Sequence, residues 1–488
     1  MRLISRRRLR FFLYVLIGFI MVTIITRGIV QFQLNKEIKY YKRFFKENKD
    51  SLEQMFNPLE IKQIPEEVID SLYSETLSRA SKTNKGINWD KFAYVNYVTD
   101  ASYLCNTLIM FNKLKTEFQT KAKLVLLVTK DLIEDNATNK EKNILMLASI
   151  KNVDSEQVRI KYVDNIVKPK DYTPWNESLT KLRVFNETDF DRIIYMDNDA
   201  ALTANLDELF FLPQYIKFAA PMTYWFISQN DLKEAYHELQ HDDRITLNLN
   251  NYNKQTISRI KKGKMIYNHL PSLPSSLYLN SKNVAQEIIS STSSASPLFD
   301  FHTSKKASKI KFASNIMVIK PSKETFDKIL YELLPRALTK KEMYDMDLIN
   351  EELYNLKKIV YYQFSLFRKL KSEFIPEVMV LPFGRYGLLT GSLRNKNHYS
   401  MISNDILGYK RMDNDGNELL GLDKSVADAK YIHFSDYPIG KPWHYVSIKE
   451  FECVPDAETA EDLDQETKAC NIWNSFYDTF IQARSICN

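Results

Sequence analysis

Two carboxylates follow directly on an apolar run between Arg192 and Ala200, where the sequence reads Arg-Ile-Ile-Tyr-Met-Asp-Asn-Asp-Ala. Ile193 to Met196 have strand character, so Asp197 and Asp199 emerge where a buried strand ends. Ligands of open α/β sheets bind at the carboxyl ends of strands, and two oxygen donors placed there suit a hard divalent cation that carries a diphosphate. The stretch therefore predicts an Asp-x-Asp site for a metal and a nucleotide sugar.

The same tripeptide pattern recurs at Asp413 to Asp415, where Gly416 and Asn417 follow. No apolar strand precedes this second pair, and Gly and Asn favour a solvated turn. The preceding strand therefore distinguishes the two patterns, and only the first is interpreted as a metal site.

Strands and helices are expected to alternate around the acidic pair from Trp89 onward. The expected strands are 92–98, 123–129, 158–163, 192–196, 311–320 and 377–383, and the expected helices include 103–118, 175–185 and 347–364. Such alternation predicts an α/β fold in which a mostly parallel sheet is covered by helices on both faces. The polar segment 228–265 is expected to be a mobile loop or a small subdomain.

A basic stretch followed by an apolar stretch opens the sequence. Arginines at positions 2, 6, 7, 8 and 10 precede the uncharged run 11–26, which residues 27–30 extend. The 16 residues of that run make about 24 Å of helix, and Arg27 can snorkel to lengthen the span toward the roughly 30 Å of a hydrocarbon core. No small-x-small cleavage site follows, which favours an uncleaved anchor over a cleaved signal peptide.

The arginines before the anchor keep that end cytosolic, so the rest of the chain is expected to face the lumen as a single-pass type II protein. The expected parts are a cytosolic basic tail at 1–10, a transmembrane signal anchor at 11–30, a lumenal stem at 31–88, a catalytic domain at 89–450 and a cysteine-containing C-terminal extension at 451–488. The stem has an alternative interpretation as the first helices of the catalytic domain.

The charge balance bears on which partners the chain can bind, and its cysteines bear on the compartment in which it folds. After residue 30 the chain has 61 basic and 61 acidic residues, so no nucleic-acid surface is predicted. In an oxidising lumen some pairing among Cys453, Cys470 and Cys487 is expected, whereas Cys105 is interpreted as a buried free thiol.

Four motifs together carry a family resemblance over about residues 90–445. They are the run 93–103 with Tyr97, Thr99 and Tyr103, then Thr180-Lys181-Leu182, then Tyr195-Met-Asp-Asn-Asp199, and finally Ile432-His433-Phe434 with Lys441-Pro442-Trp443. In order and spacing the chain resembles the retaining glycosyltransferases of family 8, to which glycogenin belongs. Within that family it is most similar to the fungal Golgi N-acetylglucosaminyltransferases of the glucose N-acetyltransferase family. The resemblance implies a GT-A-type, Rossmann-like fold behind an N-terminal transmembrane helix.

The resemblance also implies a set of site residues. Asp197, Asp199 and His433 would bind Mn²⁺, because two hard oxygens and one imidazole suit manganese better than calcium. The donor would be bound by Asp197 and by four further side chains, Tyr97, Thr99, Tyr103 and Lys441, with Lys181 reaching it from the segment before the metal strand. Each has an ordinary structural alternative, as a core histidine, a core tyrosine or a surface lysine.

The acceptor side rests on the stretch Tyr344 to Asn350. Asp345 and Asp347, together with Lys181, are the expected catalytic residues, and either aspartate can orient an acceptor hydroxyl. As carboxylates at the start of a helix they need no function, because the helix dipole favours them there. Met346 stands where many family members have an amide, which suits a donor with a different substituent.

The expected reaction is retaining, metal-dependent transfer of N-acetylglucosamine from UDP-GlcNAc to mannose residues of N-linked glycan outer chains or mannan in the Golgi lumen. One alternative is a glucosyl- or galactosyltransferase of the same family that acts on another glycan. A metal-dependent phosphoesterase would need a second metal cluster. An inactive, membrane-anchored glycan-binding protein would be expected to lack one of Asp197, Asp199, His433 and Lys441, and all four are present.

Overall fold

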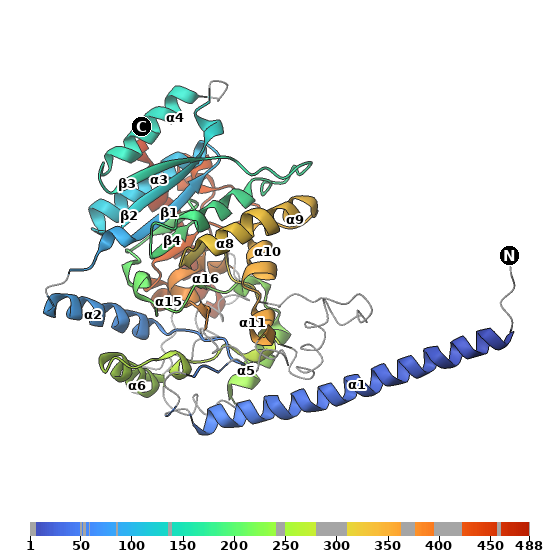
Figure 1. Cartoon of the computed structure of the whole chain (residues 1–488). Coiled ribbons are helices and arrows are strands. Elements are labelled where there is room, and N and C mark those ends of the chain that lie inside the picture. Colours follow the sequence, from blue (N-terminus) through green and yellow to red (C-terminus); the bar gives the residue numbers. More distant parts are fainter. Residues whose placement is uncertain are drawn as a thin grey trace.

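The computed structural model describes residues 6–48, 51, 55–57, 59–83, 86–134, 139–240, 249–279, 310–362, 376–394, 422–455 and 460–487. Within these ranges a body of sheets and helices is joined to one long helix that projects from it (Figure 1). The expected turn at Asp413 to Asp415 lies outside the described residues.

A seven-stranded sheet forms the centre of the body, in the order β3-β2-β1-β4-β7-β6-β8. Its strands are β1 (Phe92–Val98), β2 (Lys123–Thr129), β3 (Val158–Val163), β4 (Arg192–Met196), β6 (Phe218–Ala220), β7 (Ile316–Ile319) and β8 (Val378–Val380). In this sheet β7 alone runs antiparallel to its neighbours. The predicted GT-A-type α/β fold with a mostly parallel, Rossmann-like sheet is therefore confirmed.

The strand order reverses at β1. The chain first runs from β1 outward through β2 to β3, and it then crosses back to form β4 on the other side of β1. Open α/β sheets form a crevice at the carboxyl ends of the strands where the strand order reverses in this way. In this sheet the crevice lies between the residues that follow Val98 and those that follow Met196. The topology therefore places Asp197 and Asp199 opposite the segment that begins at Thr99.

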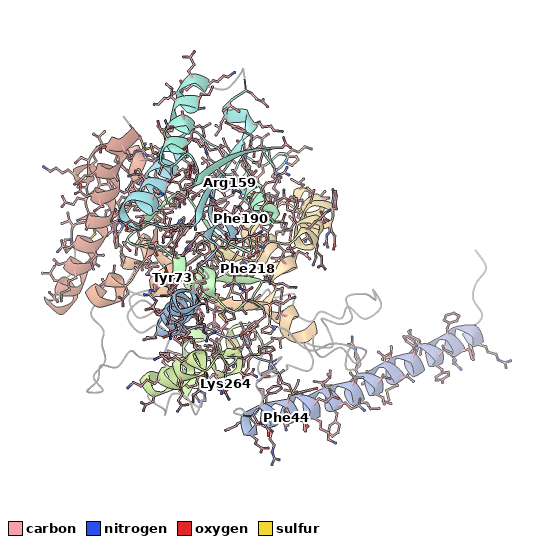
Figure 2. All side chains as sticks on the ribbon, turned by 60° about the vertical axis from the view of Figure 1, so that its left-hand side comes forward. Phe44, Tyr73, Arg159, Phe190, Phe218 and Lys264 are labelled. Atoms are coloured by element: carbon pink, nitrogen blue, oxygen red, sulfur yellow. A yellow bond between two sulfur atoms is a disulfide. The ribbon has the colours of Figure 1, made fainter. Side chains whose placement is uncertain are left out.

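The central strands are buried on both faces. Alternate side chains of β1 enter two different cores, with Ala93 and Val95 in one and Tyr94 and Val98 in the other. This period of two is what a strand covered on both sides requires. Figure 2 shows how densely side chains fill the body around the labelled Phe218, which is fully buried.

A second, three-stranded sheet lies next to the crevice, with β10 (Tyr431–His433) between β5 (Ala200–Leu202) and β9 (Leu388–Leu389). β10 pairs antiparallel with β5, and His433 lies opposite Ala200. This pairing joins segments far apart in the sequence and places His433 beside the end of the Asp-x-Asp stretch.

The helix that projects from the body is α1 (Arg6–Glu47), and it contains the expected anchor. Its most apolar 18-residue window has a mean hydropathy of 2.2 and none of it is buried, so the helix is long and apolar enough to cross a membrane. Leu34, Ile38 and Phe45 in its later turns are buried. Figure 1 shows the N-terminal end of α1 far from the body and its other end beside it.

The chain rejoins the body well before the expected end of the stem at residue 88. Gln63 forms a backbone bridge with Val380 at the edge of the main sheet. Val68 in α2 (Glu66–Lys82) is fully buried. From Leu59 onward this segment therefore packs against the body.

Three expected elements have a different form. The expected helix 175–185 is a 3₁₀ helix, η4 (Ser178–Asn186), and the expected helix 347–364 is divided between α10 (Asp345–Leu348), a π-helical turn and α11 (Leu356–Tyr362). The described part of the insertion 228–265 contains α5 (Gln229–Gln240) and α6 (Leu249–Lys261). Tyr252 and Ile260 of α6 are buried, so this helix packs through an apolar face that the polar composition concealed.

All four cysteines are paired, Cys105 with Cys487 and Cys453 with Cys470. The interpretation of Cys105 as a buried free thiol is therefore wrong. Its partner lies 382 residues later in the sequence, in the turn that follows the last described α-helix. A local sequence pattern cannot predict a contact over such a separation. The expected pairing among the last three cysteines holds for Cys453 and Cys470 alone.

Candidate active site

One cleft of about 1580 Å³ opens at the crevice of the main sheet, and all ten residues with an expected role line it. They are Tyr97, Thr99, Tyr103, Lys181, Asp197, Asp199, Asp345, Asp347, His433 and Lys441. The fold thus gathers side chains from segments spread over more than 300 residues of sequence. Their roles remain predictions, and the geometry restricts what each of them can do.

The acidic pair is fixed through the backbone on both sides. The N–H of Asp197 donates to the carbonyl of Asn315 at 2.8 Å, which ties it to the strand beyond β4. The side chain of Asn198 donates to the carbonyl of Tyr97 at 2.8 Å, which ties it to the end of β1. The hydroxyl of Tyr195 donates to the carboxylate of Asp197. The two carboxylates therefore have defined positions at the carboxyl edge of the sheet.

His433 reaches the same point from the second sheet. The N–H of Phe434 donates to the carbonyl of Asp199 at 3.0 Å, which continues the pairing of β10 with β5. Nδ1 of His433 lies 3.3 Å from Oδ1 of Asp199, yet it is buried and has no hydrogen-bond partner among the described residues. Burial lowers the pKa of His433 to about 4 despite the nearby carboxylate, so the imidazole is neutral near pH 7.

Asp197, Asp199 and His433 fit a divalent cation. One ligand atom from each lies within 4.8 Å of the others, and the ligands of an octahedral ion lie about 3 to 4.2 Å apart when the ion–ligand distances are about 2.1 Å. A buried imidazole nitrogen that faces a carboxylate and has no hydrogen-bond partner is the arrangement that a shared cation satisfies. Within the described ranges no second group of this kind occurs.

The two carboxylates differ in their electrostatic surroundings. Burial raises the pKa of Asp197 to about 7, against the opposing charge of Lys181, and the proximity of Asp199 adds to the rise. Burial also disfavours the charged form of Asp199, but His433 and Lys441 outweigh it and lower the pKa of Asp199 to about 2. Two acidic groups this close repel each other when both are ionised, and a cation between them removes that repulsion.

Lys181 connects the acidic pair to the expected acceptor side. Its Nζ lies 3.1 Å from Oδ1 of Asp197 and 3.0 Å from Oδ2 of Asp345, and it donates to the carbonyl of Ser314 at 3.2 Å. Burial alone would lower the pKa of Lys181, but the carboxylates of Asp197 and Asp345 raise it above its ordinary value. Lys181 is therefore a buried, permanently charged link between two acidic groups of the cleft.

Lys441 contacts the other carboxylate of the acidic pair. Its Nζ donates to Oδ2 of Asp199 at 2.8 Å and to the carbonyl of Phe434. Its side chain retains 31% of its exposure, so it is accessible from the cleft. A point cation in this position can contact an anion that is also bound at the acidic pair.

The loop that carries Lys441 is held by an acid that sequence reasoning missed. The carboxylate of Asp436 accepts hydrogen bonds from Nε1 of Trp473 at 2.9 Å, from the hydroxyl of Tyr477 at 2.7 Å and from the hydroxyl of Thr390. Trp473 and Tyr477 lie on α16 (Ala460–Ala483), in the region expected to be a separate extension. No sequence pattern links these residues, because the contacts depend on how α16 packs against the loop.

The backbone of this loop also lies so close to residue 391 that only glycine fits there. A Cβ at Gly391 would lie 2.7 Å from the carbonyl oxygen of Ser435, closer than any side chain tolerates. The loop of His433 and Lys441 can therefore lie against the β9 end only because residue 391 has no side chain.

Aromatic rings define one end of the cleft. The rings of Tyr103 and Trp443 meet edge to face with their centroids 5.2 Å apart, and Tyr97 lies with its ring centroid 6.1 Å from that of Tyr195. Helix α3 (Ser102–Asn112) begins here, and Asp100 and Ser102 both line the cleft. Aromatic faces suit a base, and the N-terminus of a helix suits phosphate groups.

Asp345 and Asp347 line the same cleft as the acidic pair and have different partners. Asp345 is buried, accepts a hydrogen bond from the Ser314 hydroxyl at 2.8 Å and pairs with Lys181. Asp347 pairs with Lys311 at 2.6 Å. Only Asp345 is joined through Lys181 to the acidic pair, at Asp197.

Comparison with known proteins adds to this geometry. No protein-family model matches the chain. Glucose N-acetyltransferase 1 of Saccharomyces cerevisiae is 62% identical over 100% of both chains, and that of Candida glabrata is 53% identical over 100% of this chain and 97% of its own. The solved bifunctional glycosyltransferase WbbM matches 82% of this chain and 52% of its own with 13% identity and a TM-score of 0.37, so this chain spans about half the length of WbbM.

Proposed function

The chain belongs to the glucose N-acetyltransferase 1 family of glycosyltransferases, and from this premise we propose that it transfers N-acetylglucosamine from UDP-GlcNAc to mannose residues of N-linked glycan outer chains. We propose Mn²⁺ as its metal ion and retention of configuration at the anomeric carbon. The observation that carries the proposal is the convergence of Asp197, Asp199 and His433 in one cleft, flanked by Lys441 and Lys181.

The residues of the cleft divide the chemistry between them. A divalent cation held by Asp197, Asp199 and His433 supplies positive charge to the diphosphate of the donor. Lys441 adds a second positive charge, because its Nζ is accessible beside Asp199 and can donate to a phosphate oxygen as the leaving group gains charge. No covalent protein nucleophile is part of the proposal.

Lys181 and Asp345 orient the acceptor hydroxyl in this proposal. Nζ of Lys181 lies 3.0 Å from Oδ2 of Asp345, and a carboxylate held in this way can accept hydrogen bonds from sugar hydroxyls. Holding the acceptor hydroxyl near the anomeric carbon converts the reaction between two bound molecules into an effectively unimolecular step. We assign Tyr97, Thr99 and Tyr103 to the uridine and ribose, at the end of the cleft where the rings lie.

We further propose that the enzyme works in the Golgi lumen as a type II membrane protein. Helix α1 has the length and composition of a signal anchor. Both disulfides fit an oxidising compartment, because structural disulfides are rare in the cytosol.

Release of uridine diphosphate tests the proposed function. The detergent-solubilised full chain is incubated with UDP-GlcNAc, UDP-glucose or UDP-galactose and a branched mannose oligosaccharide, with and without Mn²⁺. We expect release that requires Mn²⁺ and the acceptor and that is fastest with UDP-GlcNAc. Faster release with another sugar would change the donor. Failure of all three donors would reject the transferase and favour an inactive glycan-binding protein.

Removal of the imidazole tests the metal site separately. We expect His433→Ala to raise the Mn²⁺ concentration for half-maximal activity by roughly 10- to 100-fold, because the substitution removes a metal ligand. The order of preference among the donors should not change, because it depends on other side chains. The measurement is a Mn²⁺ titration of the UDP-release rate. His444→Ala is the matched control, since His444 lines the same cleft but is not one of the three grouped residues. An unchanged titration in His433→Ala would assign His433 to the core instead.

A further inference from the structure

The cleft has a second aromatic surface, and this surface has no place in the scheme for the metal and the nucleotide. Trp175 is 60% exposed although it lines the cleft, and Tyr344 beside it lines the cleft too. Their ring centroids lie 6.0 Å apart with the planes tilted by 59°. Single exposed aromatic residues are common on protein surfaces, but two that meet inside the concave wall of a functional cleft indicate a binding surface.

The loop that carries Trp175 is held in one arrangement before anything binds. The N–H of Lys168 donates to the carbonyl of Asn176 at 2.8 Å, which closes the loop, and the buried Nζ of Lys168 donates to the carbonyl of Lys341 at 2.8 Å. The hydroxyl of Tyr344 donates to Oδ2 of Asp171 at 2.8 Å. A surface that is ordered in advance loses little conformational freedom on binding, which favours affinity.

The ring of Tyr344 is fixed as well. Nζ of Lys168 lies 4.5 Å from the centroid of this ring, in a cation–π contact. The hydroxyl of Thr173 lies 3.2 Å from that of Tyr344, so both the face and the hydroxyl of this ring have partners. Trp175 in turn projects from the same closed loop, and its exposed ring is the part of this surface that remains available.

A series of contacts places this surface relative to the reacting groups. It begins at the ring of Trp443, which meets that of Tyr103 and lies two residues after Lys441, and Lys441 pairs with Asp199. The other carboxylate of the acidic pair, Asp197, binds Lys181. Lys181 binds Asp345, the residue after Tyr344. In this series of contacts, the acidic pair and Lys181 therefore come between the aromatic surface of Trp175 and Tyr344 and the rings that we assign to the nucleotide. A sugar bound there would not have to displace the donor.

The chemistry of the surface matches a hexose. One face of a pyranose ring consists of C–H groups with a small positive charge, and these pack favourably on the electron-rich face of an indole. The hydroxyls around the rim of the sugar need polar partners, and Asn176, Glu177 and Asp347 line the cleft next to the two rings. We propose that Trp175, supported by Tyr344, is the acceptor subsite, and that a hexose of the glycan acceptor stacks on its indole.

This assignment rests on the proposed function, and its test separates the acceptor from the donor. In Trp175→Ala we expect the KM for the branched mannose oligosaccharide to rise roughly 10- to 30-fold, as for loss of an aromatic anchor, while the KM for UDP-GlcNAc changes by less than about twofold. Trp175→Phe keeps an aromatic face and should recover most of the affinity. A merely structural role of Trp175 would not divide the two KM values in this way.

The matched control is Tyr172→Ala, because Tyr172 is 96% exposed on the same loop and does not line the cleft. We expect it to behave as the wild type. Asn176, which begins an Asn-Glu-Ser sequence, is unchanged in all three variants, so a glycan at this position would affect them equally.

The outcomes are distinct. A wild-type acceptor KM in Trp175→Ala, or an equal rise of both KM values, would overturn the acceptor subsite. If the wild type releases no UDP from any donor, the proposed function fails, and titration of the same oligosaccharide by calorimetry then decides the subsite. Binding that weakens in Trp175→Ala but not in Tyr172→Ala would support it, and equal binding or no binding would overturn it.

Discussion

The Asp199→Ala variant is expected to lose about 10³-fold or more of the wild-type kcat while it remains folded. Asp199 belongs to the group that fits the cation, and its other oxygen positions Lys441 at 2.8 Å. One substitution therefore removes a metal ligand and releases the lysine that stabilises the leaving group. The measurement is the rate of UDP release at saturating UDP-GlcNAc and Mn²⁺.

The Asp199→Ala variant should still fold, because the substitution removes the charge repulsion with Asp197 as well as the contact with Lys441. Asp199 raises the pKa of the neighbouring Asp197, and this repulsion disappears with the carboxylate. Lys441 loses its partner but is partly exposed, so its charge can be hydrated. We expect the thermal unfolding midpoint to remain close to that of the wild type.

Asp189→Ala is the matched control, since this carboxylate is 73% exposed and lies outside the cleft. It should retain wild-type turnover. If Asp199→Ala also turned over at the wild-type rate, the assignment of the metal site would be rejected. If it unfolded, the role of Asp199 would be structural.

The sequence alone was sufficient to place the acidic pair at the end of a strand, because the pattern that indicates this is local. An apolar run ending in Asp197 identifies both the strand and the place where the strand ends, and β4 is buried throughout as that run predicts. The strands 92–98, 123–129 and 158–163 were predicted with their observed limits for the same reason. Neither their order nor the reversal at β1 follows from local pattern, since both depend on which strands pair.

The remaining features of the cleft depend on contacts between distant segments. His433 meets Asp199 only because β10 pairs with β5 in one register, and only the resemblance to a known family suggested this contact. Asp436 accepts hydrogen bonds from residues of α16, and Cys105 forms a disulfide with Cys487 near the end of the chain. Trp175 was expected to begin the helix 175–185, but the backbone there forms a turn before η4 and leaves the ring exposed. Spacing cannot reveal a surface that the turn creates.

Substitution of Lys441 is expected to separate catalysis from metal binding. In Lys441→Ala we expect kcat to fall by about 10²-fold, because the side chain is proposed to neutralise charge that appears on the diphosphate as the glycosidic bond breaks. Its Nζ occupies Oδ2 of Asp199 at 2.8 Å, so removal of the amine leaves that carboxylate more available to a cation. The Mn²⁺ concentration for half-maximal activity should therefore stay the same or decrease, whereas it rises in His433→Ala.

A charged substitution at this position and a control substitution at a neighbouring lysine sharpen the test. Lys441→Arg keeps the positive charge but replaces a compact ammonium by a planar group, so we expect a kcat between those of Lys441→Ala and the wild type. Lys449→Ala removes an exposed lysine from the following turn and should leave kcat unchanged. If Lys441→Ala instead weakened Mn²⁺ binding and left kcat at saturating metal intact, Lys441 would act by holding the loop through the carbonyl of Phe434. The charge that assists the departing diphosphate would then have to come from the metal site alone.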